Sequence, residues 1–216
     1  MRLLLLSFAV ILPCQGALIA YWNFNELAIG SASSPGTGNA PSSIIATQGS
    51  GTLDLADWTG TVDDFAGSTN NSLNSDPAEE SLSLIAASGT IGNGGSILLQ
   101  FSMSGMSNPT LSYVTQGTAT GFNSVQLAWS TDGIGFTSFG SAYDPASSYA
   151  LQSYDLASVD SLDGAATAYL RLSFDGATGS SGNNRIDNIQ INAIPEASSA
   201  LLWLGSLGTL LLRRRR

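Results

Sequence analysis

The chain has 216 residues, with 16 acidic residues against 7 arginines for a formal net charge of −9, one cysteine and no histidine. The absence of histidine excludes Ser-His-Asp and Cys-His nucleophile systems and the ordinary zinc sites. The acidic surplus disfavours nucleic acid and anionic lipid headgroups as partners, because like charges repel. Composition therefore predicts a protein that binds no nucleic acid and has few routes to catalysis.

The N-terminus has the pattern of a secretory signal peptide. Arg2 precedes an apolar run over residues 3–12, and small residues lead up to Ala17. We predict a signal peptide over residues 1–16 and export of the remaining chain. Cys14 falls inside this segment, so an exported domain that begins at Ala17 contains no cysteine and its fold cannot depend on disulfides.

Residues 17–193 are long enough for one domain with its own core, and their pattern is that of short strands. In 96–103 and 124–130 apolar and polar residues alternate, which is typical of half-buried strands bounded by turn residues. About nine to eleven strands with no convincing helix between them predict an all-β, antiparallel β-sandwich, with a jelly roll as the favoured topology. The other predicted strands are 17–24, 42–47, 81–86, 110–115, 149–156, 166–174 and 185–192. Asp132-Gly133 predicts a hairpin after 124–130.

Carboxylates are the remaining groups for acid–base chemistry. A glycoside hydrolase needs two carboxyls about 5 to 9.5 Å apart across the scissile bond. The neighbouring pairs Asp63-Asp64 and Glu79-Glu80 lie in loop-like contexts. We therefore predict that the chain is not an enzyme, and a glycoside hydrolase-like activity is the minor alternative.

Asp187 is the most informative acidic residue of the domain. A strand period of two places it on the same face as Ile189 and Ile191, which the apolar pattern marks as the inner face. A carboxylate buried there needs a partner, because an uncompensated buried charge is costly. Arg185, a backbone amide or a bound cation would each serve.

The segment that contains Asp187 is similar to the last strand of jelly rolls of the carbohydrate-binding-module type, in which an Asp-Asn step follows a Gly/Asn loop. In some of those families the terminal-strand aspartate holds a structural calcium ion together with an acidic residue near the first strand. The resemblance implies one calcium site formed by Asp187 and Glu26, since calcium prefers oxygen ligands. The alternative is that Asp187 is hydrogen-bonded and Glu26 faces solvent.

Sugar binding without chemistry would use exposed aromatic rings. Trp58, in a region of weak alternation beside a glycine, and Tyr143, in a loop-like segment before Asp144-Pro145, are the two candidates for such a platform. Core positions for both rings are the competing interpretation.

The C-terminal residues 194–216 form a three-part tail. Pro195-Glu196-Ala197 precedes an uncharged apolar span over 198–212, and the chain ends in Arg213, Arg214, Arg215 and Arg216. As a helix the apolar span, counted from Ala197, reaches roughly 24 Å, a little short of the ~30 Å hydrocarbon core of a bilayer. The arginines resist transfer and act as a stop signal. We predict a transmembrane sorting helix.

This order of parts resembles the PEP-CTERM sorting tail of Gram-negative bacteria, with Ala197 where that family usually has a second proline. The resemblance implies recognition at Pro195 and Glu196 by an exosortase, an integral-membrane processing enzyme. It also implies transient insertion into the inner membrane and delivery to the cell surface or the exopolysaccharide matrix. An ordinary C-terminal membrane anchor is the alternative.

Two functions thus compete. One is a surface or biofilm-matrix protein with a non-catalytic β-sandwich. The other is a calcium-stabilised module that binds exopolysaccharide.

Overall fold

The computed structural model describes residues 16–196. The predicted signal peptide up to residue 15, the apolar span and the arginines Arg213 to Arg216 lie outside the described residues, and so does the predicted sorting helix. Within residues 16–196, no helix is both long and apolar enough to cross a bilayer.

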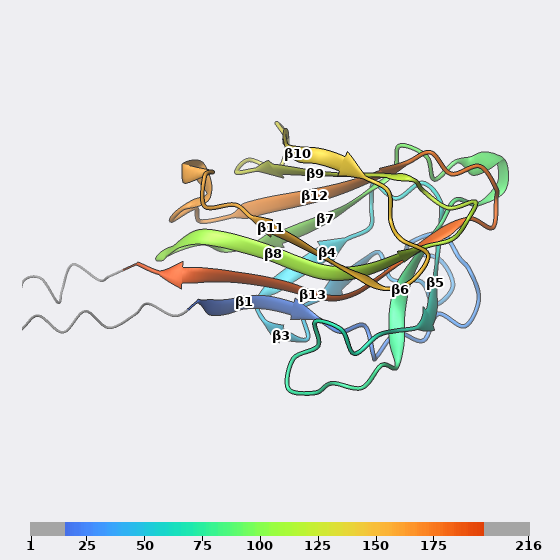
Figure 1. The fold of residues 1–216 in the computed structure, drawn as a ribbon, viewed down its shortest axis with the longest axis horizontal. Helices are drawn as coiled ribbons and strands as arrows, with labels where there is room; N and C mark the ends of the chain where they lie inside the picture. Colours follow the sequence, from blue (N-terminus) through green and yellow to red (C-terminus); the bar gives the residue numbers. More distant parts are fainter. Residues whose placement is uncertain (1–15, 197–216) are drawn as a thin grey trace, which may run out of the picture.

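The described part of the chain contains two antiparallel sheets that face each other (Figure 1). Sheet A has the order β11-β8-β13-β1-β3, and β6 with its partner β5 joins it through β13. Sheet B has the order β10-β9-β12-β7-β4-β2. The strands are β1 (Ala17–Trp22), β2 (Ser43–Ile45), β3 (Gln48–Gly49), β4 (Gly51–Asp54), β5 (Thr61–Ala66), β6 (Glu80–Ile85), β7 (Ser96–Phe101), β8 (Met106–Gly117), β9 (Ser124–Ser130), β10 (Thr137–Tyr143), β11 (Ala150–Asp155), β12 (Ala168–Asp175) and β13 (Asn183–Pro195). Two short 3-10 helices are η1 (Ser88–Thr90) and η2 (Asp160–Leu162).

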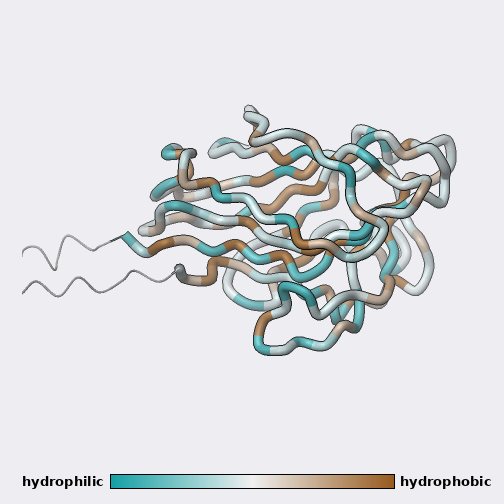
Figure 2. Tube along the Cα trace, in the orientation of Figure 1, coloured by the Kyte–Doolittle hydropathy of each residue, from teal (hydrophilic) through white to brown (hydrophobic). Residues whose placement is uncertain are grey.

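Alternation along the strands builds the core between the sheets. In β12, Leu170, Leu172 and Phe174 are buried in the core, whereas Arg171 and Ser173 between them are half-buried on the other face. The same change from apolar to polar residues is visible along most strands (Figure 2). Each fully buried large apolar side chain stabilises the fold by about 1.5–3 kcal/mol relative to exposure, so this pattern fixes which face of each sheet turns inward.

The predicted all-β antiparallel sandwich is confirmed. Four strands differ from the prediction. Strands β3, β4 and β5 were not predicted, and β10 continues to Tyr143, which was expected in a loop-like segment. Asp63 and Asp64, expected in a loop, lie within β5, where Asp63 pairs with Ser83. This strand was missed because its two adjacent carboxylates interrupt the alternation of apolar and polar residues, and only Val62 is fully buried.

The first and last strands of the described chain are neighbours in sheet A. β1 runs antiparallel to β13, with Ala17 opposite Ala193. The start of β1 and the end of β13 therefore lie at the same end of the sandwich (Figure 1).

Candidate functional site

A β-bulge in β13 corrects the predicted orientation of Asp187. Ile186, Ile189 and Ile191 all belong to the core, and the register against β8 shifts between Asp187 and Gln190. Two residues of β13 therefore stand opposite one residue of β8, which reverses the alternation at that point. Asp187 consequently lies on the outer face of sheet A, opposite to the face that a strict period of two predicts.

Asp187 is buried because a loop covers this outer face. Residues 67–76, the first part of the connection from β5 to β6, form what we call the 67–76 loop. Asn188, the bulge residue, has a φ of 50°. Its Oδ1 accepts a hydrogen bond of 2.7 Å from the Tyr21 hydroxyl. Its Nδ2 donates to the carbonyl oxygens of Ser68 at 2.6 Å and Asn70 at 3.0 Å.

Further contacts hold the middle of the 67–76 loop. The Nδ2 of Asn71 donates to the carbonyl of Asn188 at 2.7 Å and to the hydroxyl of Ser112 at 3.1 Å. The Nε2 of Gln190 donates to the carbonyl of Asn71. Side chains of β13 thus satisfy backbone groups of the loop, which is the requirement for burying irregular backbone, and Ser112 of β8 holds the side chain of Asn71.

The Asp187 carboxylate accepts two backbone hydrogen bonds. The amide of Ser68 donates to Oδ2 and the amide of Asn188 donates to Oδ1, each at 2.7 Å. Burial raises the pKa of Asp187 from its ordinary 3.8 to about 7, and these two bonds oppose the rise. Close packing also explains Gly67, because a Cβ there would lie 2.5 Å from Asp187 Oδ2.

The two predicted calcium ligands have different environments. Glu26 is exposed, and within residues 16–196 no hydrogen bond or ion pair joins its side chain to Asp187. The described residues contain no group of three or more acidic, cysteine or histidine side chains placed to hold a metal ion. Of the two alternatives for Asp187, the structure shows the hydrogen-bonded one, with amide donors on both oxygens.

Trp58 is a core residue, which corrects its placement as an exposed platform. Its side chain is only 4% exposed. The ring makes edge-to-face contacts with Phe122 and Phe174, at centroid distances of 5.3 and 5.6 Å. Its Nε1 donates to the carbonyl of Thr61 at 3.0 Å. Both the apolar and the polar part of this side chain are therefore already engaged inside the protein.

Tyr143 is half-buried and does not offer a free ring and hydroxyl. Its hydroxyl lies 2.9 Å from the hydroxyl of Tyr113, a core residue of β8. Burial raises the pKa of Tyr143 well above its usual value. Tyr143 closes the end of β10 against the core, so it too is a poor sugar platform.

The Asp63-Asp64 pair binds backbone amides. The Asp64 carboxylate accepts from the amides of Ile29 and Gly30, at 3.2 and 3.1 Å. Those bonds contribute to lowering the pKa of Asp64, whereas burial raises the pKa of Asp63. The geometry accounts for this pair as an anchor for the loop after β1.

Pro195 and Glu196, the predicted sorting motif, stand at the end of β13. Pro195 pairs with Met106 of β8, and the amide of Glu196 donates to the carbonyl of Gly105 at 2.9 Å. Glu196 itself is exposed. The motif therefore lies at the last backbone contacts of the described sandwich.

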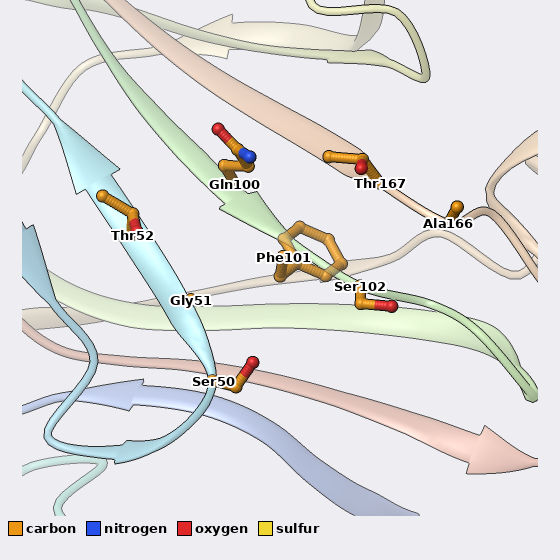
Figure 3. Close-up of a pocket in the computed structure, with 8 residues that line it drawn as sticks. All are labelled: Ser50, Gly51, Thr52, Gln100, Phe101, Ser102, Ala166 and Thr167. Carbon is orange, nitrogen blue, oxygen red and sulfur yellow. The ribbon is translucent and has the colours of Figure 1, made fainter.

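An uncharged cavity of about 230 Å³ opens on sheet B, and we name it the Gln100 cavity (Figure 3). Figure 3 shows Gln100 on β7 between Thr52 on β4 and Thr167, which immediately precedes β12. The complete lining is Ser50, Gly51, Thr52, Gln100, Phe101, Ser102, Ala166 and Thr167. Sequence analysis missed this site, although the alternation of 96–103 already placed Gln100 on the outer face.

Two other cavities contain a carboxylate. One of about 290 Å³ lies among the loops that follow β8, β10 and β12 and includes Asp144. Another, of about 570 Å³, lies on sheet A beside the end of β13 and includes Asp155. The Gln100 cavity differs from both in having only hydroxyl, amide and apolar groups.

No protein-family model and no curated protein matches this chain. Solved structures resemble it at low identity. The CBM22-1 xylan-binding domain of Paenibacillus barcinonensis Xyn10C has a TM-score of 0.43 and 11% identity, covering 84% of this chain and 97% of that one. The K3 cleaved adhesin domain of Lys-gingipain from Porphyromonas gingivalis W83 has a TM-score of 0.44 and 14% identity, covering 82% and 99%. TmCBM61, solved with β-1,4-galactotriose, has a TM-score of 0.39 and 10% identity, covering 78% and 92%. This likeness is one of β-sandwich architecture, and it adds no weight to any binding function.

Proposed function

We propose that this chain is an exported protein of the cell surface or exopolysaccharide matrix, sorted through its C-terminal tail by an exosortase-type enzyme. The supporting observation is where the described strands begin and end. β1 begins at Ala17 and β13 ends at Pro195, so every described strand lies between the two predicted processing sites. Removal of both terminal segments would leave the core intact, as a displayed domain requires.

The position of the motif is compatible with processing. Pro195 and Glu196 contact β8 and the preceding turn only at the end of the sheet, where strands open at low cost in free energy. Release of the end of β13 would give a membrane enzyme access to the peptide bonds beside Glu196. The sandwich itself contributes no catalytic step to the proposal.

Peptide mapping of the exported protein in its native host tests the sorting proposal. We expect the last recovered peptide to end near Pro195 or Glu196. Recovery of an intact tail ending in Arg216 on the exported protein would contradict it. Replacing both Pro195 and Glu196 by Ala should block processing. The matched control replaces Pro77 and Glu79, a proline and a glutamate in another surface loop, and should be processed normally.

A second proposed function, binding of polysaccharide by the sandwich, is favoured by the Gln100 cavity. Hydroxyl and amide groups on an open sheet face suit ligands that present many hydroxyls. The test is binding of the exported protein to exopolysaccharide from its own host, with and without a calcium chelator. Saturable binding supports this function. Loss of that binding in chelator would point to the calcium-stabilised form of it, and no binding in either condition leaves a purely structural surface protein.

A further inference from the structure

We propose that the Gln100 cavity is a subsite for one residue of a neutral polysaccharide, with the ring of Tyr169, which lies beside the cavity, as an aromatic contact. This inference rests on the second proposed function, polysaccharide binding, and specifies where the ligand binds and what charge it has. It rests on the polar groups of the cavity, the register of sheet B and the charge of its surroundings.

Three polar side chains of the cavity make no hydrogen bond within the described protein, whereas the hydroxyl of Ser102 is bonded to Ser104. Gln100 is exposed, and within residues 16–196 no hydrogen bond engages its side-chain amide. The same holds for the hydroxyls of Thr52 and Thr167. An amide supplies two donors and one acceptor, and each hydroxyl supplies a donor and an acceptor. Strands β4 and β7 and the residue before β12 thus present a set of free donors and acceptors that matches the vicinal hydroxyls of a sugar.

Strand register places an aromatic ring beside these groups. Gln100 pairs with Thr52 on one side and with Tyr169 of β12 on the other. The three side chains therefore form one row across the outer face of sheet B, since directly paired residues point to the same side. Tyr169 is half-buried, and within the described chain its hydroxyl has no partner.

The β9–β10 turn fixes the Tyr169 ring. A Cβ at Gly133 would lie 3.1 Å from Tyr169 Cζ and within 3.4 Å of both Cε atoms. The main chain of this turn therefore packs against the ring, and a Cβ here would be crowded by the ring and strained by the φ of 73°. The turn is rigid, because Asp132 Oδ1 accepts from the amides of Ile134 and Gly135 at 2.8 and 2.9 Å. A ring held in place loses little freedom when a sugar stacks on it.

Charge selects a neutral ligand. Fifteen acidic residues lie between residues 17 and 194, against Arg171 and Arg185 alone, a formal net charge of −13. A polyanion would be repelled by this domain as a whole. The Gln100 cavity adds no positive charge that would offset the repulsion. Its volume of about 230 Å³ is below the usual ~300–1,000 Å³ of small-molecule pockets, which fits one sugar unit of a longer chain.

Affinity electrophoresis of the exported protein tests the inference. The probes are soluble xylan, β-1,4-galactan and dextran, with polygalacturonate as the anionic comparison. We expect retardation by at least one neutral polymer. Gln100→Ala should weaken that binding about tenfold, and Thr167→Val about threefold, as expected for two and one lost hydrogen bonds. Gln116→Ala is the control in the other sheet, at a half-buried glutamine of β8 whose amide donates to the carbonyl of Ser147 at 2.8 Å, and this variant should bind as the wild type does.

The outcomes separate the site from the function. If the wild type binds a neutral polymer and Gln100→Ala binds equally well, this subsite is wrong while polysaccharide binding stands. If only polygalacturonate retards the protein, the inference of a neutral ligand is wrong. If no polymer, including the host exopolysaccharide, is bound, the second proposed function and the subsite both fail. Unchanged melting temperatures of the variants, whose side chains lie at the surface, exclude unfolding as the cause of a loss.

Discussion

Replacing Asn188 by alanine should destabilise the sandwich more than any other single loss of a polar side chain in sheet A. The variant removes the acceptor of the Tyr21 hydroxyl and the donor to the carbonyls of Ser68 and Asn70. Tyr21 and Asn188 are 0% and 2% exposed, so water does not replace these bonds without opening the 67–76 loop.

The magnitude follows from the number of bonds and the backbone conformation. Each of the three bonds contributes about 1 kcal/mol net, and a buried partner left unsatisfied raises that figure. Alanine at a φ of 50° adds roughly 1 kcal/mol, because left-handed backbone is unfavourable for a residue with a Cβ. We therefore expect a loss of about 4 kcal/mol, a large part of the ~5–15 kcal/mol that stabilises a typical domain.

Urea unfolding monitored by tryptophan fluorescence measures this loss. Asn108→Ala is the matched control, since Asn108 has a φ of 52° but its side chain donates only one hydrogen bond, to Ser107 at 3.3 Å. The control should lose about 1–1.5 kcal/mol. Asn188→Gly should recover about 1 kcal/mol relative to Asn188→Ala, because glycine tolerates this φ. Equal losses for Asn188→Ala and Asn108→Ala would refute the reasoning that the 67–76 loop is held by Asn188.

Three further predictions concern titration, packing and close approach. Because burial raises the pKa of Asp187 to about 7, the folded protein keeps a proton that the unfolded chain releases above its ordinary pKa of 3.8. The contribution of Asp187 to the free energy of unfolding is therefore full below about pH 4 and falls as the pH rises to about 7. The melting temperature of the wild type relative to Asp187→Asn should decrease from pH 5 to pH 8, and a constant difference would contradict the shift. Trp58→Ala should lower the free energy of unfolding by about 3–5 kcal/mol through the cavity left between Phe122 and Phe174, measured by urea midpoint at constant m-value. Gly182→Ala should prevent stable folding, because its Cβ would lie 1.9 Å from a backbone oxygen, whereas Gly94→Ala meets no atom within 4 Å and should lose about 1 kcal/mol from its φ alone, as thermal unfolding of both variants would show.

The fold class could be predicted because a strand with one buried face alternates apolar and polar residues along the sequence. Val125, Leu127 and Trp129 alternate with polar residues, and β9 has the predicted bounds, Ser124–Ser130. The missed strands lack that signal. β4 has one buried side chain, Leu53, and β3 is only two residues long. Such strands form because they pair with neighbouring strands, and a single sequence does not show which segments pair.

The orientation of Asp187 could not be obtained from strict alternation, although the sequence holds a clue. Ile186 and Ile189 are three residues apart, and both are in the core. An odd spacing within one strand requires an extra residue, and an asparagine between them is among the few residue types that readily adopt positive φ. The pattern Ile-Asp-Asn-Ile therefore contains a bulge signal, which a strict period of two counted from Ile189 and Ile191 does not detect.

The exposure of the Trp58 ring was predicted wrongly for a different reason. Trp58 follows Asp57 and lies two residues before Gly60, which are residue types common at the surface, and Asp57 and Thr59 are indeed exposed. The ring is nevertheless buried, because Phe122 and Phe174 come from loops and strands far away in the sequence and enclose it. Contacts of this kind depend on topology, so composition around a residue does not determine the exposure of its side chain.

The outer faces of the two sheets differ, so a substitution on one face can change stability and a substitution on the other can change binding. The outer face of sheet A is occupied where the 67–76 loop lies on Asn188 and Gln190, whereas the face of sheet B at Gln100 is open. The two sets of residues share no described contact. Distant, independent sites have additive effects. Asn188→Ala should therefore lower stability without changing polysaccharide affinity below the unfolding transition, and Gln100→Ala should do the reverse. Coupling between the two substitutions larger than about 0.5 kcal/mol in a double-mutant cycle would show that the 67–76 loop and the Gln100 cavity belong to one functional unit.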